Sequence, residues 1–149
     1  MSNHAAAIPF STTVEVRDTC LCLHVQRAAR ALARRFDMAL KPSGLNNNQF
    51  SLMMSLNRPQ AATMKSVCDL LATDRTTLTA ALKVLERRGL VKSEVDPKDR
   101  RGRLLTLTDA GMAALMQALP IWKRVHAELD AELGAGGAQQ VRQTLAHIR

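Results

Sequence analysis

Residues 74–111 read DRTTLTAALKVLERRGLVKSEVDPKDRRGRLLTLTDAG, and this stretch decides the fold. Residues 75–88 carry leucine and alanine at the three- and four-residue spacing of an amphipathic helix. Asp74 immediately before them is a favoured N-cap, and Gly89 immediately after them suits the left-handed end of a helix. The sequence therefore predicts one well-delimited helix at this place.

Beyond this helix the hydrophobic period changes to that of β-strands. Residues 90–95 and 103–108 are rich in β-forming residues, and the charged turn 96–102 joins them, which predicts a β-hairpin with a basic tip. Another helix is predicted before the first one, at residues 63–71, with a short turn between the two. Helix, short turn, helix and hairpin in this order predict a winged helix-turn-helix.

The rest of the chain reads mainly as helix. Residues 1–13 are small and polar and predict a flexible N-terminus. Further helices are predicted at residues 14–40, at 48–57, at 109–133 with a kink at Pro120, and in a last short segment around 141–148. The predicted fold class is therefore mainly α, with a small β-hairpin wing.

Composition limits the functions that the chain can have. Its 149 residues include 21 Lys and Arg against 13 Asp and Glu, a net charge of +8, which favours a polyanionic partner such as nucleic acid. Only 3% of the residues are aromatic, so a single-strand binder that stacks bases on aromatic rings is disfavoured. No nucleophile–base set, metal-ligand set or phosphate loop is recognisable, and we expect neither an enzyme nor a metal or cofactor site.

The sequence also suggests where the protein works. It contains no apolar run of membrane-spanning length and no recognisable signal peptide. Its three cysteines, an odd number, do not make a disulfide framework and suit a reducing compartment. We therefore expect a cytoplasmic protein with no membrane partner.

Polar and basic side chains lie where a DNA-reading helix and a wing need them. The face of helix 75–88 opposite its leucines would contact base edges in the major groove. Thr77, in the first turn, would meet a phosphate at the helix N-terminus. The charged hairpin tip suits phosphates or the minor groove. The candidate DNA-binding residues are Arg75, Thr76, Thr77, Thr79, Lys83, Lys98, Arg100, Arg101 and Arg103.

The chain resembles the MarR family of bacterial transcriptional regulators. The resemblance rests on residues 74–79 (DRTTLT), 85–91 (LERRGLV), 96–103 (DPKDRRGR) and 107–111 (LTDAG), and the wing segment is its most specific part. The resemblance implies a homodimer whose first and last helices interlock, a recognition helix at 75–88 and a pseudo-palindromic double-stranded operator. It also implies that Arg101 reaches the minor groove, held by a salt bridge to Asp99.

This resemblance also divides the chain into functional parts. After the flexible N-terminus at 1–13, a dimerisation helix occupies 14–45, and the winged helix-turn-helix DNA-binding domain occupies 46–108. Dimerisation helices follow at 109–149. The expected partners are therefore double-stranded DNA, a second copy of the chain, and a small aromatic ligand or an oxidant as effector.

Cys20 and Cys22 leave two interpretations open. Free cysteines are often buried in the core. If both residues lie on one continuous helix, their side chains point about 200° apart around the helix axis and would not form a disulfide with each other. Organic-hydroperoxide-sensing members of the family carry a reactive cysteine eight residues before an arginine, and Cys22 stands eight before Arg30. Those sensors hold the thiol with tyrosines, of which this chain has none. Cys68 is expected in the core.

The effector and the type of regulator also remain open. The first interpretation is a sequence-specific repressor released by a small ligand, with a thiol-based redox regulator that uses Cys22 as the alternative. A further alternative is an architectural DNA-binding protein with no sequence preference. Aromatic and methionine residues at helical spacing usually belong to a core, and the same reading applies to Trp122. The candidate ligand-pocket residues are His24, Arg27, Phe36, Phe50 and Met53.

Overall fold

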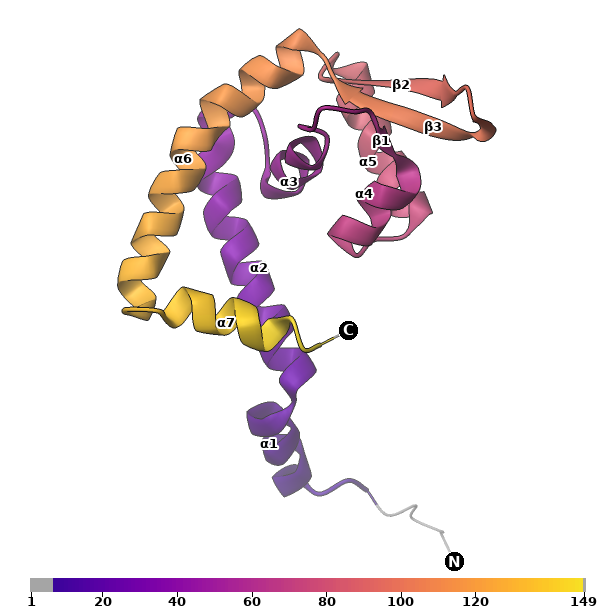
Figure 1. Ribbon diagram of the computed structural model, residues 1–149. Helices are drawn as coiled ribbons and strands as arrows, with labels where there is room; N and C mark the ends of the chain where they lie inside the picture. The colour runs from indigo at the N-terminus through magenta and orange to yellow at the C-terminus, as the bar shows by residue number, and fades with distance from the viewer. Residues whose placement is uncertain (1–6, 149) are drawn as a thin grey trace, which may run out of the picture. The chain divides into compact units, whose positions relative to one another are not determined.

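A computed structural model of the chain describes residues 7–148 (Figure 1). The chain divides into two compact units, one that ends at Arg35 and one that begins at Phe36. The N-terminal unit contains α1 (Phe10–Thr19) and the first part of α2 (Leu21–Leu40). No helix among the described residues is both long and apolar enough to span a bilayer.

The N-terminal unit differs from the sequence prediction in two places. Residues 10–13, within the segment predicted to be flexible, are helical, and residues 1–6 of that segment lie outside the described residues. The helix predicted at 14–40 is in fact two helices, because Cys20 between them is extended, with φ −68° and ψ 106°.

The break at Cys20 is stabilised by local side-chain hydrogen bonds. The hydroxyl of Thr19 donates to the carbonyl oxygen of Glu15 at 2.7 Å. The Cys20 sulfur accepts a hydrogen bond from the backbone N–H of Leu23 at 3.4 Å. Side chains thus bond backbone groups of both helices around the break, which a continuous hydrophobic period does not reveal.

The second unit contains the other elements in nearly the predicted order. Its helices are η1 (Lys41–Ser43), α3 (Asn47–Ser55), α4 (Met64–Leu71), α5 (Arg75–Arg87), α6 (Asp109–Leu133, which runs through Pro120) and α7 (Gly137–Leu145). The cap of α3 is Asn46, whose side chain accepts a hydrogen bond from the backbone N–H of Gln49 at 2.8 Å. The Gln49 side chain accepts one from the N–H of Asn46 at 3.0 Å, which completes a capping box.

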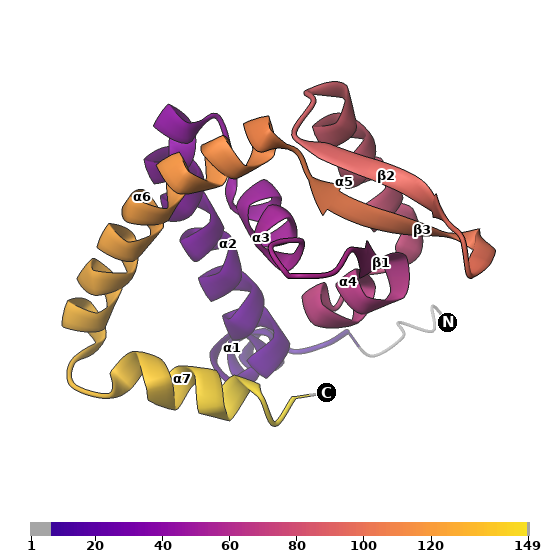
Figure 2. The ribbon, with the colours of Figure 1, turned by 45° about the horizontal axis from the view of Figure 1, so that its top comes forward.

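Three antiparallel strands form the wing sheet, in the order β1-β3-β2. These strands are β1 (Ala62–Thr63), β2 (Val91–Asp96) and β3 (Asp99–Leu107). β3 is longer than predicted and takes in most of the expected turn, while β1 was not predicted because two residues show no period. Figure 2 shows the tip of the β2–β3 hairpin extending away from α4 and α5.

The core of the second unit holds α5 by its inner face. Leu78, Leu82 and Leu85 are at most 4% exposed and belong to one hydrophobic cluster with Val67 of α4 and Leu105 of β3. This packing fixes the rotation of α5 about its own axis and therefore determines which side chains face outward. This arrangement confirms the predicted class, a mainly helical winged helix-turn-helix with a small antiparallel wing.

The end of α5, the base of the wing and the start of α6 meet at one junction. The Thr108 hydroxyl donates to the carbonyl oxygen of Gly89 at 2.6 Å, and the Thr108 N–H donates to the carbonyl oxygen of Leu90 at 3.2 Å. The same hydroxyl caps α6 by accepting from the N–H of Gly111 at 3.0 Å. A Cβ atom on Gly111 would overlap the carbonyl oxygen of Leu90, so this close packing requires glycine.

Candidate nucleic-acid interface

The outer face of α5 presents the candidate base-reading residues. Arg75, Thr76, Thr79 and Lys83 are all exposed, on the side of the helix away from its buried leucines. Together with Ala80 they line one open groove of about 470 Å³ along the helix. Arg75 and Lys83 therefore lie on either side of the small side chains of the groove, and the opposite face of the helix packs against the core.

The N-terminus of α5 is occupied by the carboxylate of Asp74. It accepts hydrogen bonds from the backbone N–H of Thr77 at 2.7 Å and from the Thr77 hydroxyl at 2.8 Å. These two bonds, the backbone bond first, hold the pKa of Asp74 below its usual range. In this structure Thr77 is therefore a capping partner of Asp74, with both of its donors engaged, and the expected phosphate contact stays a prediction.

The wing tip is held by two aspartates that bond to the backbone. Asp96 accepts a hydrogen bond from the N–H of Lys98 at 2.9 Å, and Asp99 accepts one from the N–H of Arg101 at 3.0 Å. No ion pair joins the side chains of Asp99 and Arg101, so the implied salt bridge is not formed in the described chain. The carboxylate shapes the turn instead. The predicted cations of the hairpin are all exposed: Lys98, Arg100, Arg101 and Arg103.

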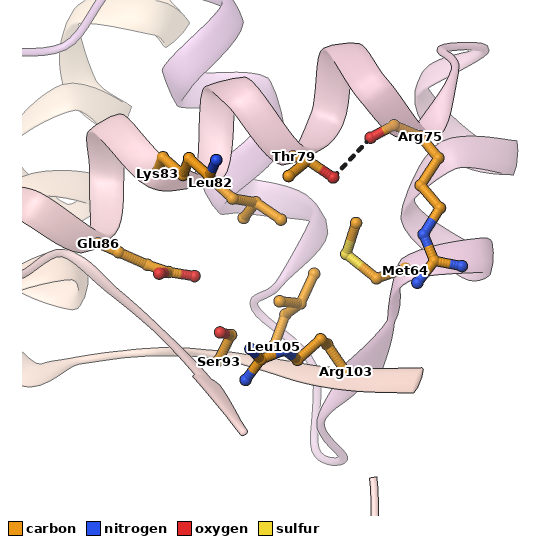
Figure 3. A pocket seen from close by; sticks show the side chains of 9 residues that line it. All are labelled: Met64, Arg75, Thr79, Leu82, Lys83, Glu86, Ser93, Arg103 and Leu105. Atoms are coloured by element: carbon orange, nitrogen blue, oxygen red, sulfur yellow. Dashed lines mark hydrogen bonds between the residues drawn. The ribbon is translucent and has the colours of Figure 1, made fainter. Parts of the chain in front are cut away.

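The recognition helix and the wing are joined at the cationic surface. The Arg75 guanidinium donates to the backbone carbonyl oxygen of Arg101 at 3.4 Å. Between helix and wing lies a pocket of about 230 Å³, shown in Figure 3. It is lined by Met64, Arg75, Thr79, Leu82, Lys83, Glu86, Ser93, Arg103 and Leu105. Three of the predicted cations thus converge on one concave surface.

Two polar residues of this pocket were not predicted from the sequence. Glu86 lies seven residues after Thr79 on the same face of α5, and this spacing is the signal that could have identified it. Ser93 lies on β2, and only the fold brings it close to the helix. A carboxylate and a hydroxyl therefore accompany the cations in this pocket.

Arg88 fixes the other end of α5 and was also not predicted. Its guanidinium donates to the carbonyl oxygen of Gly44 at 2.8 Å and to the side chain of Gln49 at 3.5 Å. Gly44 has φ +74°, the left-handed region that favours glycine. The recognition helix is thus tied at its start to the wing and at its end to the segment that precedes α3.

The three cysteines occupy different environments. Cys22 is exposed, and its sulfur accepts a hydrogen bond from the side-chain amide of Gln26 at 3.0 Å. Cys20 is half-buried at the break between α1 and α2. Cys68 is half-buried and packs against the core of the second unit, close to its expected place. Cys22 is therefore not part of the hydrophobic core of the single chain, and its role as a redox sensor stays a prediction.

One of the candidate ligand-pocket residues, Phe50, lines a cavity of the second unit. His24 and Arg27 are exposed in the N-terminal unit, whereas Phe36, Phe50 and Met53 are buried in the core of the second unit. Phe50 also lines a cavity of about 360 Å³, together with Ser51, Met54, Ser55, Leu70, Leu119 and Trp122. Met53 is fully buried and does not line that cavity, whereas the next residue on α3, Met54, does.

The chain is similar to known transcriptional regulators. The model of the MarR family matches residues 43–102. The crystal structure of the M. tuberculosis transcriptional regulator MosR in complex with DNA is 39% identical, with a TM-score of 0.79, and the match covers 87% of this chain and 92% of that one.

Curated relatives give the same assignment over shorter matches. The transcriptional activatory protein BadR of Rhodopseudomonas palustris is 34% identical over 94 residues, which cover 61% of this chain and 54% of BadR. The transcriptional regulator HosA of Escherichia coli is 34% identical over 89 residues, which cover 52% of this chain and 66% of HosA. The match thus spans between about half and two thirds of these relatives. The family consists of transcriptional regulators rather than enzymes, and the chain belongs to this MarR family of DNA-binding, winged helix-turn-helix proteins.

Proposed function

We propose that the protein is a homodimeric repressor that binds a pseudo-palindromic operator and is released by a small-molecule ligand. In each protomer α5 enters the major groove, and the wing contacts phosphates or the minor groove. The observation that carries the proposal is the hydrogen bond from Arg75 to the backbone of Arg101, because it joins the base-reading helix to the wing in one cationic surface. The similarity to MosR, whose structure was solved in complex with DNA, supports DNA as the partner.

Exposed apolar side chains support the homodimer. Large hydrophobic residues with roughly half or more of their surface exposed occur before α1, on α1, on α2, at the end of α6 and after α7. They include Ile8, Phe10, Val16, Leu21, Met38, Leu133 and Ile148, and the less exposed Leu32, Val141 and Leu145 extend the set. A second copy of the chain would cover such surfaces, so we assign dimerisation to residues 14–45 and 109–149 and DNA binding to 46–108.

The proposal is tested by fluorescence anisotropy. The labelled probe is a duplex from upstream of the protein's own gene, and the competitor is random duplex. We expect a preference of about a thousandfold or more for the probe, and a slope of log K against log salt near −7 if about eight phosphates are neutralised. Equal affinity for both duplexes would instead indicate the architectural alternative.

The cavity lined by Phe50 and Trp122 supports a ligand as effector. The two rings stack with centroids 6.1 Å apart, and the lining holds no charged side chain. Its volume of about 360 Å³ is at the lower end of the range of small-molecule sites. The cavity lies among α3, α4 and α6, so an aromatic ligand there would contact the helix that precedes the recognition helix.

Trp122 is the only tryptophan of the chain and reports directly on this cavity. We expect benzoate or its neutral counterpart benzamide to quench its emission and to release the bound duplex at matching concentrations. Leu70→Gln, at an exposed lining position, should weaken the quenching about tenfold, while Val84→Gln, exposed outside the cavity, should not change it. Quenching without release of the duplex would contradict the regulatory role.

Redox control through Cys22 is the second candidate function. The exposed Cys22 and the helix break at Cys20 favour it, because the two thiols do not lie on one continuous helix. An organic hydroperoxide would oxidise the Cys22 thiol to a sulfenic acid and be reduced to an alcohol, and a second thiol would then displace water to form a disulfide. The anisotropy titration is therefore repeated after treatment with equimolar organic hydroperoxide. Redox control would be supported over ligand release if the treated protein loses DNA binding, if a thiol restores it, and if Cys22→Ser shows no loss.

A further inference from the structure

We propose that Thr79 selects thymine through its methyl group, at a position of each half-site that lies between the contacts of Arg75 and Lys83. The inference rests on the proposed function, since it requires α5 to bind a specific duplex. It adds to that function the chemical identity of the base group that is recognised, the 5-methyl group of thymine.

The hydroxyl of Thr79 is already engaged with the protein. It donates to the backbone carbonyl oxygen of Arg75 at 2.7 Å, one turn earlier in α5, as the dashed line in Figure 3 shows. With its proton used in this bond, the hydroxyl cannot donate to the acceptors N7 and O6 of guanine, N7 of adenine or O4 of thymine. The hydroxyl of Thr76, on the same face, has no hydrogen-bond partner among residues 7–148. Its proton is therefore available for a hydrogen bond to DNA.

The methyl group of Thr79 is therefore the group that can recognise an apolar feature of the major groove, while the hydroxyl oxygen can still accept a hydrogen bond from the amino group of adenine or cytosine. Thr79 is exposed and lines both the groove along α5 and the pocket towards the wing. In the groove its neighbours are the small side chains of Thr76 and Ala80. The 5-methyl group of thymine is the apolar group that a major-groove edge offers, and apolar side chains such as alanine and the threonine methyl group recognise it.

The cations of the groove locate the thymine within the half-site. Arg75 and Lys83 are eight residues apart, which is about 12 Å along the helix axis and corresponds to three or four base pairs. Thr79 lies midway between them. The thymine is thus expected within about two base pairs of the guanine or phosphate contacts that the two cations make.

A uracil scan tests the inference. The probe is a duplex selected by the wild-type protein from a random-sequence library, and each symmetric pair of thymines is replaced by deoxyuracil, which removes the methyl groups alone. We expect one pair to weaken binding about tenfold. If the protein selects no preferred duplex, both the proposed function and this inference are wrong. If it selects a duplex in which no thymine pair is sensitive to uracil, only this inference is wrong.

Matched variants then connect that pair to Thr79. Thr79→Val keeps the methyl group and removes the hydroxyl, so the tenfold ratio between thymine and uracil duplexes should persist. Thr79→Ser keeps the hydroxyl and removes the methyl group, so the ratio should fall to about one. Thr63→Ser makes the same change at the N-cap of α4, outside α5, and should retain the full ratio. A ratio that persists in Thr79→Ser, or disappears in Thr79→Val, would overturn the assignment.

Discussion

Replacing Arg101 by glutamate is expected to weaken binding of the operator duplex about a thousandfold. In a dimer the change removes two cations from the DNA surface and places two anions beside a polyphosphate. The fold should tolerate it, because Arg101 is exposed and contributes to the wing through its backbone: its N–H bonds to Asp99 and its carbonyl oxygen accepts from Arg75. The loss is therefore one of binding and not of structure.

The measurement is an anisotropy titration at several salt concentrations. With Arg101→Glu the slope of log K against log salt should become shallower by about two, one phosphate contact for each protomer. Lys123→Glu is the matched control, since it makes the same change of charge at an exposed position of α6, outside α5 and the wing. Equal weakening by both variants would mean that net charge alone drives binding and that the wing has no specific role.

Gly111→Ala is expected to destabilise the fold by about 3 kcal/mol, although alanine is the better helix former. In an ordinary helix the change would stabilise by about 1 kcal/mol. Here the added Cβ atom would overlap the carbonyl oxygen of Leu90, which is backbone and cannot rotate away. The first turn of α6 would have to move from the junction, breaking the bonds of Thr108 to Gly89 and Leu90.

Urea denaturation followed by circular dichroism measures this effect. Ala113→Gly, an exposed position two residues further along α6, calibrates the ordinary cost of glycine in this helix, about 1 kcal/mol. A Gly111→Ala variant that is more stable than the wild type would show that the helix can shift freely at the junction. The contact with Leu90 would then not be a constraint.

The parts of the fold that were predicted from the sequence are those with local causes. The bounds of α5 follow from a cap at Asp74 and a glycine at position 89, and the structure places the helix at Arg75–Arg87. The hairpin follows from the change of hydrophobic period. The cations of the site are recognisable because they lie on the face opposite Leu78 and Leu82, which a helical period alone identifies.

The parts that were not predicted depend on contacts between distant residues or on single side chains. Arg88 bonds to Gly44, which is 44 positions away in the chain, and neither residue carries a periodic signal. β1 has two residues and exists only because β3 pairs with it. The break at Cys20 depends on side-chain hydrogen bonds within a stretch that otherwise has helical periodicity.

The division of α5 into a buried and an exposed face has a consequence for divergence among gene copies. Leu78, Leu82 and Leu85 hold the helix, while Thr76 and Thr79 face outward and contribute nothing to the hydrophobic cluster. After a duplication, the outward positions can therefore accumulate substitutions without selection against misfolding. Two daughter proteins can thus acquire separate regulons through very few codon changes, while both inherit the same thermal tolerance.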